Sequence, residues 1–521
     1  MVSPNNVELV YIILSNGYRV MVKKKSKKQK KPKKIISHDP ARLLKLAEAS
    51  YHQGNYKKAI QYNKDASLLA PHDADIYNTL GVLYNIIGDP KQEQKSYIQA
   101  LNIDPFHSGA NYNLGTIYRI NGNRKKAITH LKRSIKNNPQ NLTTLNNLAN
   151  LLTEDKQFDE ALEYYNTILR IDPNFVNAII NKGYLYLEQG ALKKSISLFN
   201  RAILVAPENG KAHIYKAEAM FIEEDPQKNL ERLDSIAALK HLDIEEKINV
   251  MVAKATCEWI RGDLSSLRNS LTSVENIIFQ VKKNTNIANL KRRQAYYVYL
   301  KALSEYATKT KRKDEEQNLP IMPIIGDSHC LSPAHQKIIL DGTEYKCEPH
   351  LISGIKAWHL GNSAKNKYKY AFDRTLQKLD RCPAIFTIGE IDCRSDEGIF
   401  SYHQKTDIPL KGIIMETVDL FLKFVANRIN GTGITSIFCG VPAPDNVKIQ
   451  KLSEQDKEKY LFTVRQFNSY LLSQVQANGA RFIDIYKATS GPNGTSNNKY
   501  DLDKLHLKPD FFEKYLQHYL I

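Results

Sequence analysis

The chain has 521 residues, which is more than one hydrophobic core usually holds, so two or three domains are expected. It carries 74 Lys and Arg against 55 Asp and Glu, a net charge of +19, and 42% of its residues are hydrophobic. No apolar run approaches about 18 residues, and the first twenty residues lack the pattern of a signal peptide, so the composition excludes a membrane-spanning helix and disfavours a secretory leader.

Lysines concentrate near the beginning of the chain. Residues 23–34 hold nine of them, and removing that run leaves about half of the positive excess. Such a run is typical of a solvated, disordered tail, and we assign residues 1–38 to one. The alternative is electrostatic contact with nucleic acid or an anionic surface.

Prolines recur at one constant spacing: Pro71, Pro105, Pro139, Pro173 and Pro207. Because proline cannot lie inside a continuous helix, each one predicts a boundary between helical units. Glycines at the expected turns keep the same period: Gly54, Gly88, Gly122 and Gly190. Small residues also recur where two helices must approach closely: Gly81, Gly115, Ala149 and Gly183. Lys156 replaces one turn glycine, which is tolerable if this residue can adopt a left-handed conformation.

Helical hairpins with a period of about 34 residues and these residue types resemble the tetratricopeptide repeat (TPR). The resemblance covers residues 39–225 as a solenoid of five to six repeats, and it implies binding of a protein or peptide partner. Three asparagines keep the same period: Asn113, Asn147 and Asn181. We expect them to form a ladder on the concave face that hydrogen-bonds an extended peptide. The alternative is polar exposure where no core packing is required.

Residues 226–318 keep helical periodicity but lose the strict repeat. We expect a degenerate helical extension that caps the solenoid, with a hairpin turn at Gly262 and Asp263, a further helix over 289–309 and a charged linker. After Leu319, short apolar runs alternate with amphipathic helices. The expected strands are 320–326, 384–389, 434–440 and 481–486. This alternation predicts a three-layer α/β/α domain over residues 319–521 with a parallel sheet, whose chemistry lies at the carboxyl ends of the strands.

Polar side chains follow the first of these strands and precede the last helix. Ser328 lies directly after a buried strand, on a sharp turn, and we expect a helix to begin near Pro333. Near the C-terminus, Asp503 stands three residues before His506. A carboxylate at this spacing can fix the imidazole tautomer and leave the other nitrogen free to take a proton from a serine.

Three motifs together resemble the SGNH (GDSL-type) hydrolases, over about residues 320–521. They are Gly326-Asp327-Ser328, Gly389-x-x-Asp392 and Asp503-x-x-His506. Members of this family are esterases, lipases and carbohydrate O-acetyl hydrolases or transferases. The resemblance implies that Ser328 is the nucleophile, that His506 is general base and then acid, and that Asp503 orients it.

The resemblance also implies an oxyanion hole. One donor would be the Ser328 N–H, and a second would be the N–H of Gly354, with Gly361 as the alternative. The family's third motif carries an asparagine donor, but Ile391 stands at that position here. Losing one such donor typically lowers the rate ~10²–10³-fold. Either Arg394 or another donor substitutes, or the enzyme is slow, or the site is not hydrolytic. Arg394 is equally well explained as a salt-bridge partner of Glu390 or Asp392.

The six cysteines form no C-x-x-C pair, which favours free thiols in a reducing compartment, and we expect a cytoplasmic protein without a metal or cofactor. The sequence predicts a TPR solenoid joined to a serine esterase-like domain that acts on a small ester or an acylated glycan. Two alternatives stay open. One is a catalytically silent interaction scaffold, and the other is a glycan O-acyltransferase that uses the same serine.

Overall fold

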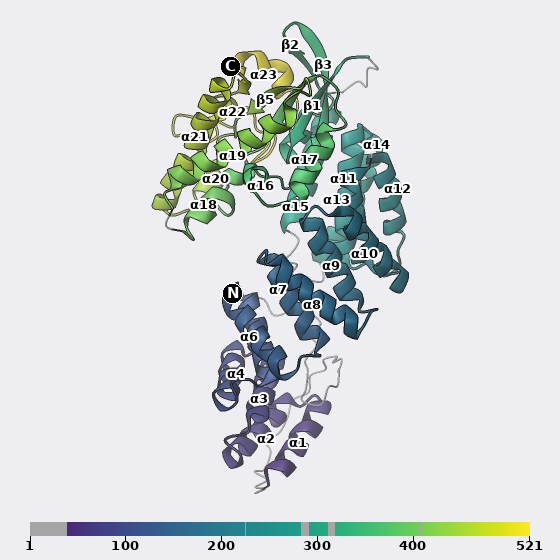
Figure 1. Cartoon of the computed structure of the whole chain (residues 1–521), viewed down its shortest axis with the longest axis vertical. Helices are drawn as coiled ribbons and strands as arrows, with labels where there is room; N and C mark the ends of the chain where they lie inside the picture. Colours follow the sequence, from purple (N-terminus) through teal and green to yellow (C-terminus); the bar gives the residue numbers. More distant parts are fainter. Residues whose placement is uncertain (1–38, 225, 283–290, 311–317, 407) are drawn as a thin grey trace. The chain divides into compact units, whose positions relative to one another are not determined.

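The computed structural model describes residues 39–521, apart from 225, 283–290, 311–317 and 407 (Figure 1). The expected basic tail, with its lysine run, and most of the expected linker lie outside the described residues. Contacts divide the chain into two compact units, the first ending at Leu185 and the second comprising Tyr186–Ile521. The domain boundaries expected from the sequence stay predictions. Across the described residues, no helix is both long enough and apolar enough to span a bilayer.

The first unit is built of paired helices. They are α1 (Pro40–His52), α2 (Tyr56–Leu69), α3 (Ala74–Ile87), α4 (Pro90–Ile103), α5 (Ser108–Ile120), α6 (Arg124–Asn137), α7 (Leu142–Glu154), α8 (Phe158–Ile171) and most of α9 (Val176–Glu188). The first helix of each of the first four hairpins begins after a capping side chain that accepts a backbone N–H, and these caps keep the constant spacing of the prolines: Asp39, Asp73, His107 and Asn141. The proline period therefore marks the hairpin boundaries.

The turns and close approaches follow the sequence pattern. Gly88 has φ +76°, and Lys156, at the equivalent place two repeats later, has φ +61°, so the lysine adopts the left-handed conformation that this turn requires. A Cβ added to Gly81 would collide with the ring of Tyr97, so this position must be glycine for the two helices of the hairpin to pack.

The three ladder asparagines lie half-buried and join successive repeats. Each donates from its side-chain Nδ2 to a residue 35 positions earlier, at 3.0–3.2 Å. The acceptors of Asn113, Asn147 and Asn181 are, in order, Asn78 Oδ1, the Tyr112 hydroxyl and Asn146 Oδ1. Each amide keeps a second N–H and oxygen lone pairs for other partners.

The second unit begins with more helices: α10 (Leu192–Val205), α11 (Gly210–Glu223), α12 (Pro226–Ala237), α13 (Ile244–Arg261), α14 (Leu264–Lys282) and α15 (Lys291–Lys309). The expected hairpin turn is confirmed, because Gly262 has φ +82° between α13 and α14. The helix expected over 289–309 corresponds to α15.

A six-stranded sheet follows, in the order β2-β3-β1-β4-β5-β6. The strands are β1 (Ile321–Gly326), β2 (Lys337–Leu340), β3 (Thr343–Leu351), β4 (Pro383–Thr387), β5 (Thr435–Cys439) and β6 (Arg481–Ile483). The remaining helices are α16 (Ala357–Gly361), α17 (Lys367–Leu376), α18 (Gly398–His403), α19 (Leu410–Ile429), α20 (Asn446–Ile449), α21 (Glu454–Ala477), α22 (Ile485–Thr489) and α23 (Phe511–Tyr519).

Two expectations for this region are wrong. The sheet is mixed, because β2 pairs antiparallel with β3 through a hairpin in which Asp341 and Gly342 both have positive φ, as a two-residue type I′ turn requires. No α-helix begins near Pro333. A 3₁₀ turn over Ser328–Leu331 is followed by strand β2 instead.

The two faces of the sheet are covered by different helices. Strand residues alternate between two cores, as Ile324 and Ile325 do in β1 and Ile437 and Phe438 in β5. One core includes residues of α16, α17, α18, α19 and α21. The other includes residues of α13, α14, α15 and α23. The helical extension therefore forms part of the layer on one face of the sheet.

The register of the central strands brings their carboxyl ends together. Gly326 of β1 pairs with Leu351 of β3 on one side and with Thr387 of β4 on the other. A Cβ at Gly326 would collide with Thr387, so only glycine permits this approach. The segments that begin after Gly326, Leu351 and Thr387 consequently start at one edge of the sheet.

The left-handed lysine gives a test of the repeat geometry. Lys156→Gly should raise the free energy of unfolding by about 0.5–1 kcal/mol, because a side chain is strained at positive φ. Urea unfolding measures this. Lys95→Gly, on the exposed side of α4, is the matched control and should lower stability by about 1 kcal/mol. Equal destabilisation by both substitutions would contradict the assigned turn.

Candidate active site

Ser328, His506 and Asp503 meet at the carboxyl edge of the sheet. Ser328 Oγ lies 2.9 Å from His506 Nε2, and His506 Nδ1 lies 3.0 Å and 2.9 Å from the two carboxylate oxygens of Asp503. Asp503 Oδ1 also accepts the backbone N–H of Leu505 at 2.7 Å and of His506 at 2.8 Å. The D-x-x-H spacing thus closes a local loop that holds carboxylate and imidazole together.

The protonation states follow from this environment. Burial opposes ionisation of Asp503, but its hydrogen bonds and the neighbouring imidazole outweigh burial and lower its pKa to about 2. Burial lowers the pKa of His506, and the bond to Asp503 opposes that shift only in part. At neutral pH the imidazole is therefore neutral. Its Nδ1–H donates to the carboxylate, and its Nε2 accepts from the Ser328 hydroxyl.

A second histidine beside the first carries the opposite charge state. His329 Nδ1 lies 2.9 Å from Asp327 Oδ1, and its Nε2 lies 3.0 Å from the Leu505 carbonyl oxygen. Burial disfavours the imidazolium, but the Asp327 carboxylate outweighs it and raises the pKa of His329 to about 9. Its ring centroid is 4.7 Å from that of His506, so this positive charge also lowers the pKa of His506.

Asp392 secures the loop that follows β3. The carboxylate accepts the backbone N–H of Ala357 at 2.7 Å and of Trp358 at 3.0 Å, and burial raises its pKa to about 7. The same loop carries Gly354, at φ +77°. Within the described chain, no backbone carbonyl outside the regular elements accepts from the Gly354 N–H or from the Ser328 N–H.

Gly361 and Arg394, which the sequence left with alternative roles, have defined neighbours here. A Cβ at Gly361 would lie 2.7 Å from the Leu420 Cβ, so Gly361 serves helix packing. Arg394 donates to both carboxylate oxygens of Glu390, at 3.0 Å and 2.8 Å, and to Glu397 at 3.2 Å, whereas Asp392 is held by backbone groups. Arg394 is thus an ion-pair residue. Ile391 is buried, and its side chain has no hydrogen-bond donor.

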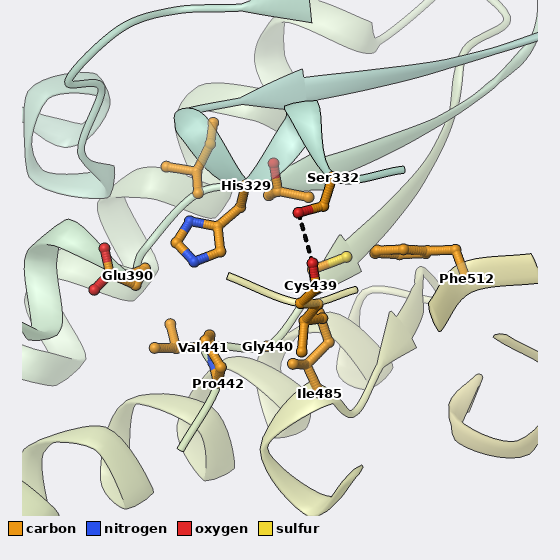
Figure 2. A pocket seen from close by; sticks show the side chains of 12 residues that line it. His329, Ser332, Glu390, Cys439, Gly440, Val441, Pro442, Ile485 and Phe512 are labelled. Atoms are coloured by element: carbon orange, nitrogen blue, oxygen red, sulfur yellow. Dashed lines mark hydrogen bonds between the residues drawn. The ribbon is translucent and has the colours of Figure 1, made fainter. Parts of the chain in front are cut away.

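A small cavity of about 20 Å³ adjoins the site (Figure 2). Its lining includes His329 and Leu507, the residues that follow Ser328 and His506 in the chain. His329 and Glu390 line it from one side, and Val441 and Pro442 line it from the segment after β5, which also supplies Gly440. The segment that follows β5 therefore contributes Gly440, Val441 and Pro442 to this region. Gly389, at φ +133°, lies directly after Ile388 of the cavity wall, and its Cβ would clash with Phe467.

One cluster in the described chain has donor atoms close enough for a metal ion. Donor atoms of Asp327, His329 and Glu390 all lie within 4.8 Å of one another. Both ring nitrogens of His329 are already hydrogen-bonded, and Arg394 occupies the Glu390 carboxylate. Imidazolium and guanidinium already supply positive charge here, so we assign no metal.

The sequence pattern did not mark Tyr299 of α15 as a site residue. Its ring stacks on His506 with centroids 3.6 Å apart and planes 13° from parallel. Its hydroxyl lies 3.1 Å from the Ser328 carbonyl oxygen and 2.8 Å from Ser332 Oγ. No sequence pattern marks the role of His329 either, because its charge depends on Asp327 and on burial.

Comparisons with known proteins establish the nature of the repeats. Tetratricopeptide repeat family models match residues 74–107, 108–174 and 152–220, so this region is an all-helical TPR superhelix, a structure that indicates protein–protein interaction. The TPR resemblance is confirmed there. No curated protein matches the chain.

Solved structures give weak likenesses. A tetratricopeptide repeat protein from Parabacteroides merdae ATCC 43184 is 16% identical over 50% of this chain and 98% of that one, with a TM-score of 0.41. Pseudomonas aeruginosa PilF is 17% identical over 44% and 98%, with a TM-score of 0.34. Yeast Tom70 is 15% identical over 53% and 57%, with a TM-score of 0.37.

The paired histidines give a direct prediction. In an NMR titration, the ring of His329 should titrate near pH 9 and that of His506 below pH 6.5. His329→Gln removes a positive neighbour and should raise the pKa of His506. His403→Gln, which alters a histidine bonded to the Ile408 carbonyl, should leave it unchanged. Both rings titrating near 6.5 would contradict the assigned charges.

Proposed function

We propose that the sheet and its helices form an SGNH-type serine hydrolase that cleaves an ester-linked acyl group. The observation that carries this proposal is the continuous line of hydrogen bonds from Ser328 Oγ through His506 to Asp503. The local Asp503 loop and the neutral His506 support it, and so do the N–H groups of Ser328 and Gly354, from which no backbone carbonyl outside the regular elements of the described chain accepts.

The residues would act in the following way. Ser328 Oγ attacks the ester carbonyl carbon while its proton passes to His506 Nε2, and Asp503 stabilises the imidazolium that forms. The N–H groups of Ser328 and Gly354 stabilise the oxyanion. His506 then gives its proton to the leaving alkoxide, which departs as the alcohol. Water then attacks the carbonyl carbon of the acyl-serine and gives a proton to the same nitrogen. The bond from that carbon to Ser328 Oγ breaks, the acid leaves, and the proton passes from His506 to Oγ.

Ile391 sets the expected rate. Because no side-chain donor stands at this position, turnover should be ~10²–10³-fold below that of a site with three donors. Arg394 does not replace the donor, since its guanidinium is held by Glu390 and Glu397. We therefore propose a slow esterase that acts on a small ester or an acylated glycan. A glycan O-acyltransferase that uses the same serine would be distinguished from a hydrolase by a reaction rate that depends on the acceptor.

Hydrolysis of p-nitrophenyl acetate tests the proposal. Ser328→Ala, His506→Ala and Asp503→Ala should each reduce turnover strongly, and loss of the serine or histidine should cost about 10³-fold or more. Ser473→Ala, on α21, controls for background reactivity. Absent wild-type turnover, or turnover indifferent to Ser328, would reject the hydrolase and favour the catalytically silent scaffold.

We further propose that the TPR unit binds an extended peptide through the asparagine ladder. Each ladder amide is held by its bond to the preceding repeat, and it keeps an oxygen and a second N–H for a peptide backbone. The lysine-rich tail as a nucleic-acid or membrane contact and the cytoplasmic location stay predictions.

An array of immobilised peptides tests this second proposal. Asn147→Ala with Asn181→Ala should weaken the peptide signals of the wild type about tenfold, because two hydrogen bonds are lost. Ester turnover should not change. Asn137→Ala, which removes an exposed amide bonded to the Phe106 carbonyl, is the control. Unchanged signals in the double variant would remove the ladder from the binding surface.

A further inference from the structure

We propose that Tyr299 is a positioning residue of the Ser328–His506 pair, so that helix α15 is an integral part of the active site. The consequence for catalysis rests on the proposed hydrolase function. The observation is that this one side chain touches both halves of the pair. Its ring stacks on His506 at 3.6 Å, and its hydroxyl contacts the Ser328 carbonyl oxygen at 3.1 Å.

The hydroxyl joins two segments that are far apart in the sequence. The hydroxyl groups of Tyr299 and Ser332 have one proton each, and together they make three hydrogen-bond contacts. The two shortest, both 2.8 Å, make a chain in which Tyr299 donates to Ser332 Oγ and Ser332 donates to the Leu507 carbonyl oxygen. The Ser328 carbonyl shares the tyrosine proton at 3.1 Å. The nucleophile turn is thereby tied to the residue that follows His506.

A second helix of the extension holds the same turn further along. Trp259 of α13 donates from its indole Nε1 to the Leu331 carbonyl oxygen at 2.8 Å. His335 Nε2 lies 2.9 Å from the Trp259 carbonyl oxygen. The segment from Ser328 to His335 is therefore fixed at its beginning by α15 and along its length by α13.

Burial makes this arrangement hard to displace. Tyr299 is 1% exposed and Trp259 is fully buried, and both belong to the core that includes Ile324 of β1. Moving α15 away would expose that face of the sheet to water. The geometry of the serine and histidine consequently depends on helices that precede residue 319, the start expected for the hydrolase domain.

The ring and the hydroxyl have separable effects. The ring covers one side of His506 and contributes to the burial that lowers the pKa of that imidazole. The hydroxyl fixes the turn that carries the nucleophile. Tyr299→Phe therefore removes the hydroxyl alone, and Tyr299→Leu removes both. Small displacements of reacting groups lower rates about 10–100-fold, and they act on kcat more than on KM.

The experiment applies two readouts to the full-length protein: p-nitrophenyl acetate kinetics and NMR titration of His506. Tyr299→Phe should lower kcat at least about tenfold with KM unchanged. Tyr299→Leu should lower kcat further and move the pKa of His506 up toward 6.5. Tyr297→Phe and Tyr297→Leu are matched controls, because Tyr297 is a buried residue of the same helix and its ring is covered by the Lys301 ammonium.

Each outcome has a defined meaning. Wild-type kcat and an unmoved His506 titration in both Tyr299 variants would overturn the inference, and so would equal losses in the Tyr297 controls. If Tyr299→Leu does not fold, the kinetics of Tyr299→Phe decide alone, and retention of wild-type kcat rejects the role. A wild type without ester turnover, together with a shifted His506 pKa in Tyr299→Leu, would reject the hydrolase and keep the positioning contact.

Discussion

The requirement that the central strands bury both faces governs the second unit. A largely parallel sheet presents apolar side chains on both sides, and each side needs a helical layer. Ile324, Ile385 and Ile437 point to the core shared with α13, α14, α15 and α23, whereas Ile325, Phe386 and Phe438 point to the opposite core. Because the helical extension supplies much of one layer, the extension and the sheet are joined by a shared core rather than by a simple linker.

The same packing positions the chemistry. The glycine at the end of β1 lets three neighbouring strands end side by side, and the loops that follow them carry Ser328, Gly354 and Asp392. The extension then brings Tyr299 against the histidine. Local charge completes the site, because two histidines with rings 4.7 Å apart are driven to opposite protonation states by Asp327 and by burial. Groups with pKa values pushed apart in this way are typical of acid–base sites.

The sequence predicted those features that are encoded by local spacing. The constant spacing of the prolines located the hairpins, and the turn period located the left-handed Lys156. Motif order and the D-x-x-H spacing brought together the serine, histidine and aspartate. The β2–β3 hairpin was missed although Asp341-Gly342 is a strong turn signal, because the strands beside it do not form clear apolar runs. A helix was expected near Pro333, but the chain uses a 3₁₀ turn and enters that hairpin.

Other features depend on tertiary contacts that no pattern in the chain records. Tyr299 lies 29 residues before Ser328, in a helix whose periodicity indicates only packing. The charge of His329 depends on the carboxylate of Asp327 within a buried site, and the engagement of Arg394 by Glu390 and Glu397 was only one of several possibilities. Such assignments require distances, so they followed from the structure.

The proposed hydrolase requires Ser328 to be an activated nucleophile. The most direct measurement is mass spectrometry of the full-length protein after reaction with a fluorophosphonate, which phosphonylates a serine hydroxyl only where a base activates it. We expect one adduct, mapped to Ser328, that does not form in His506→Ala. No adduct, or an adduct on another residue, would contradict it.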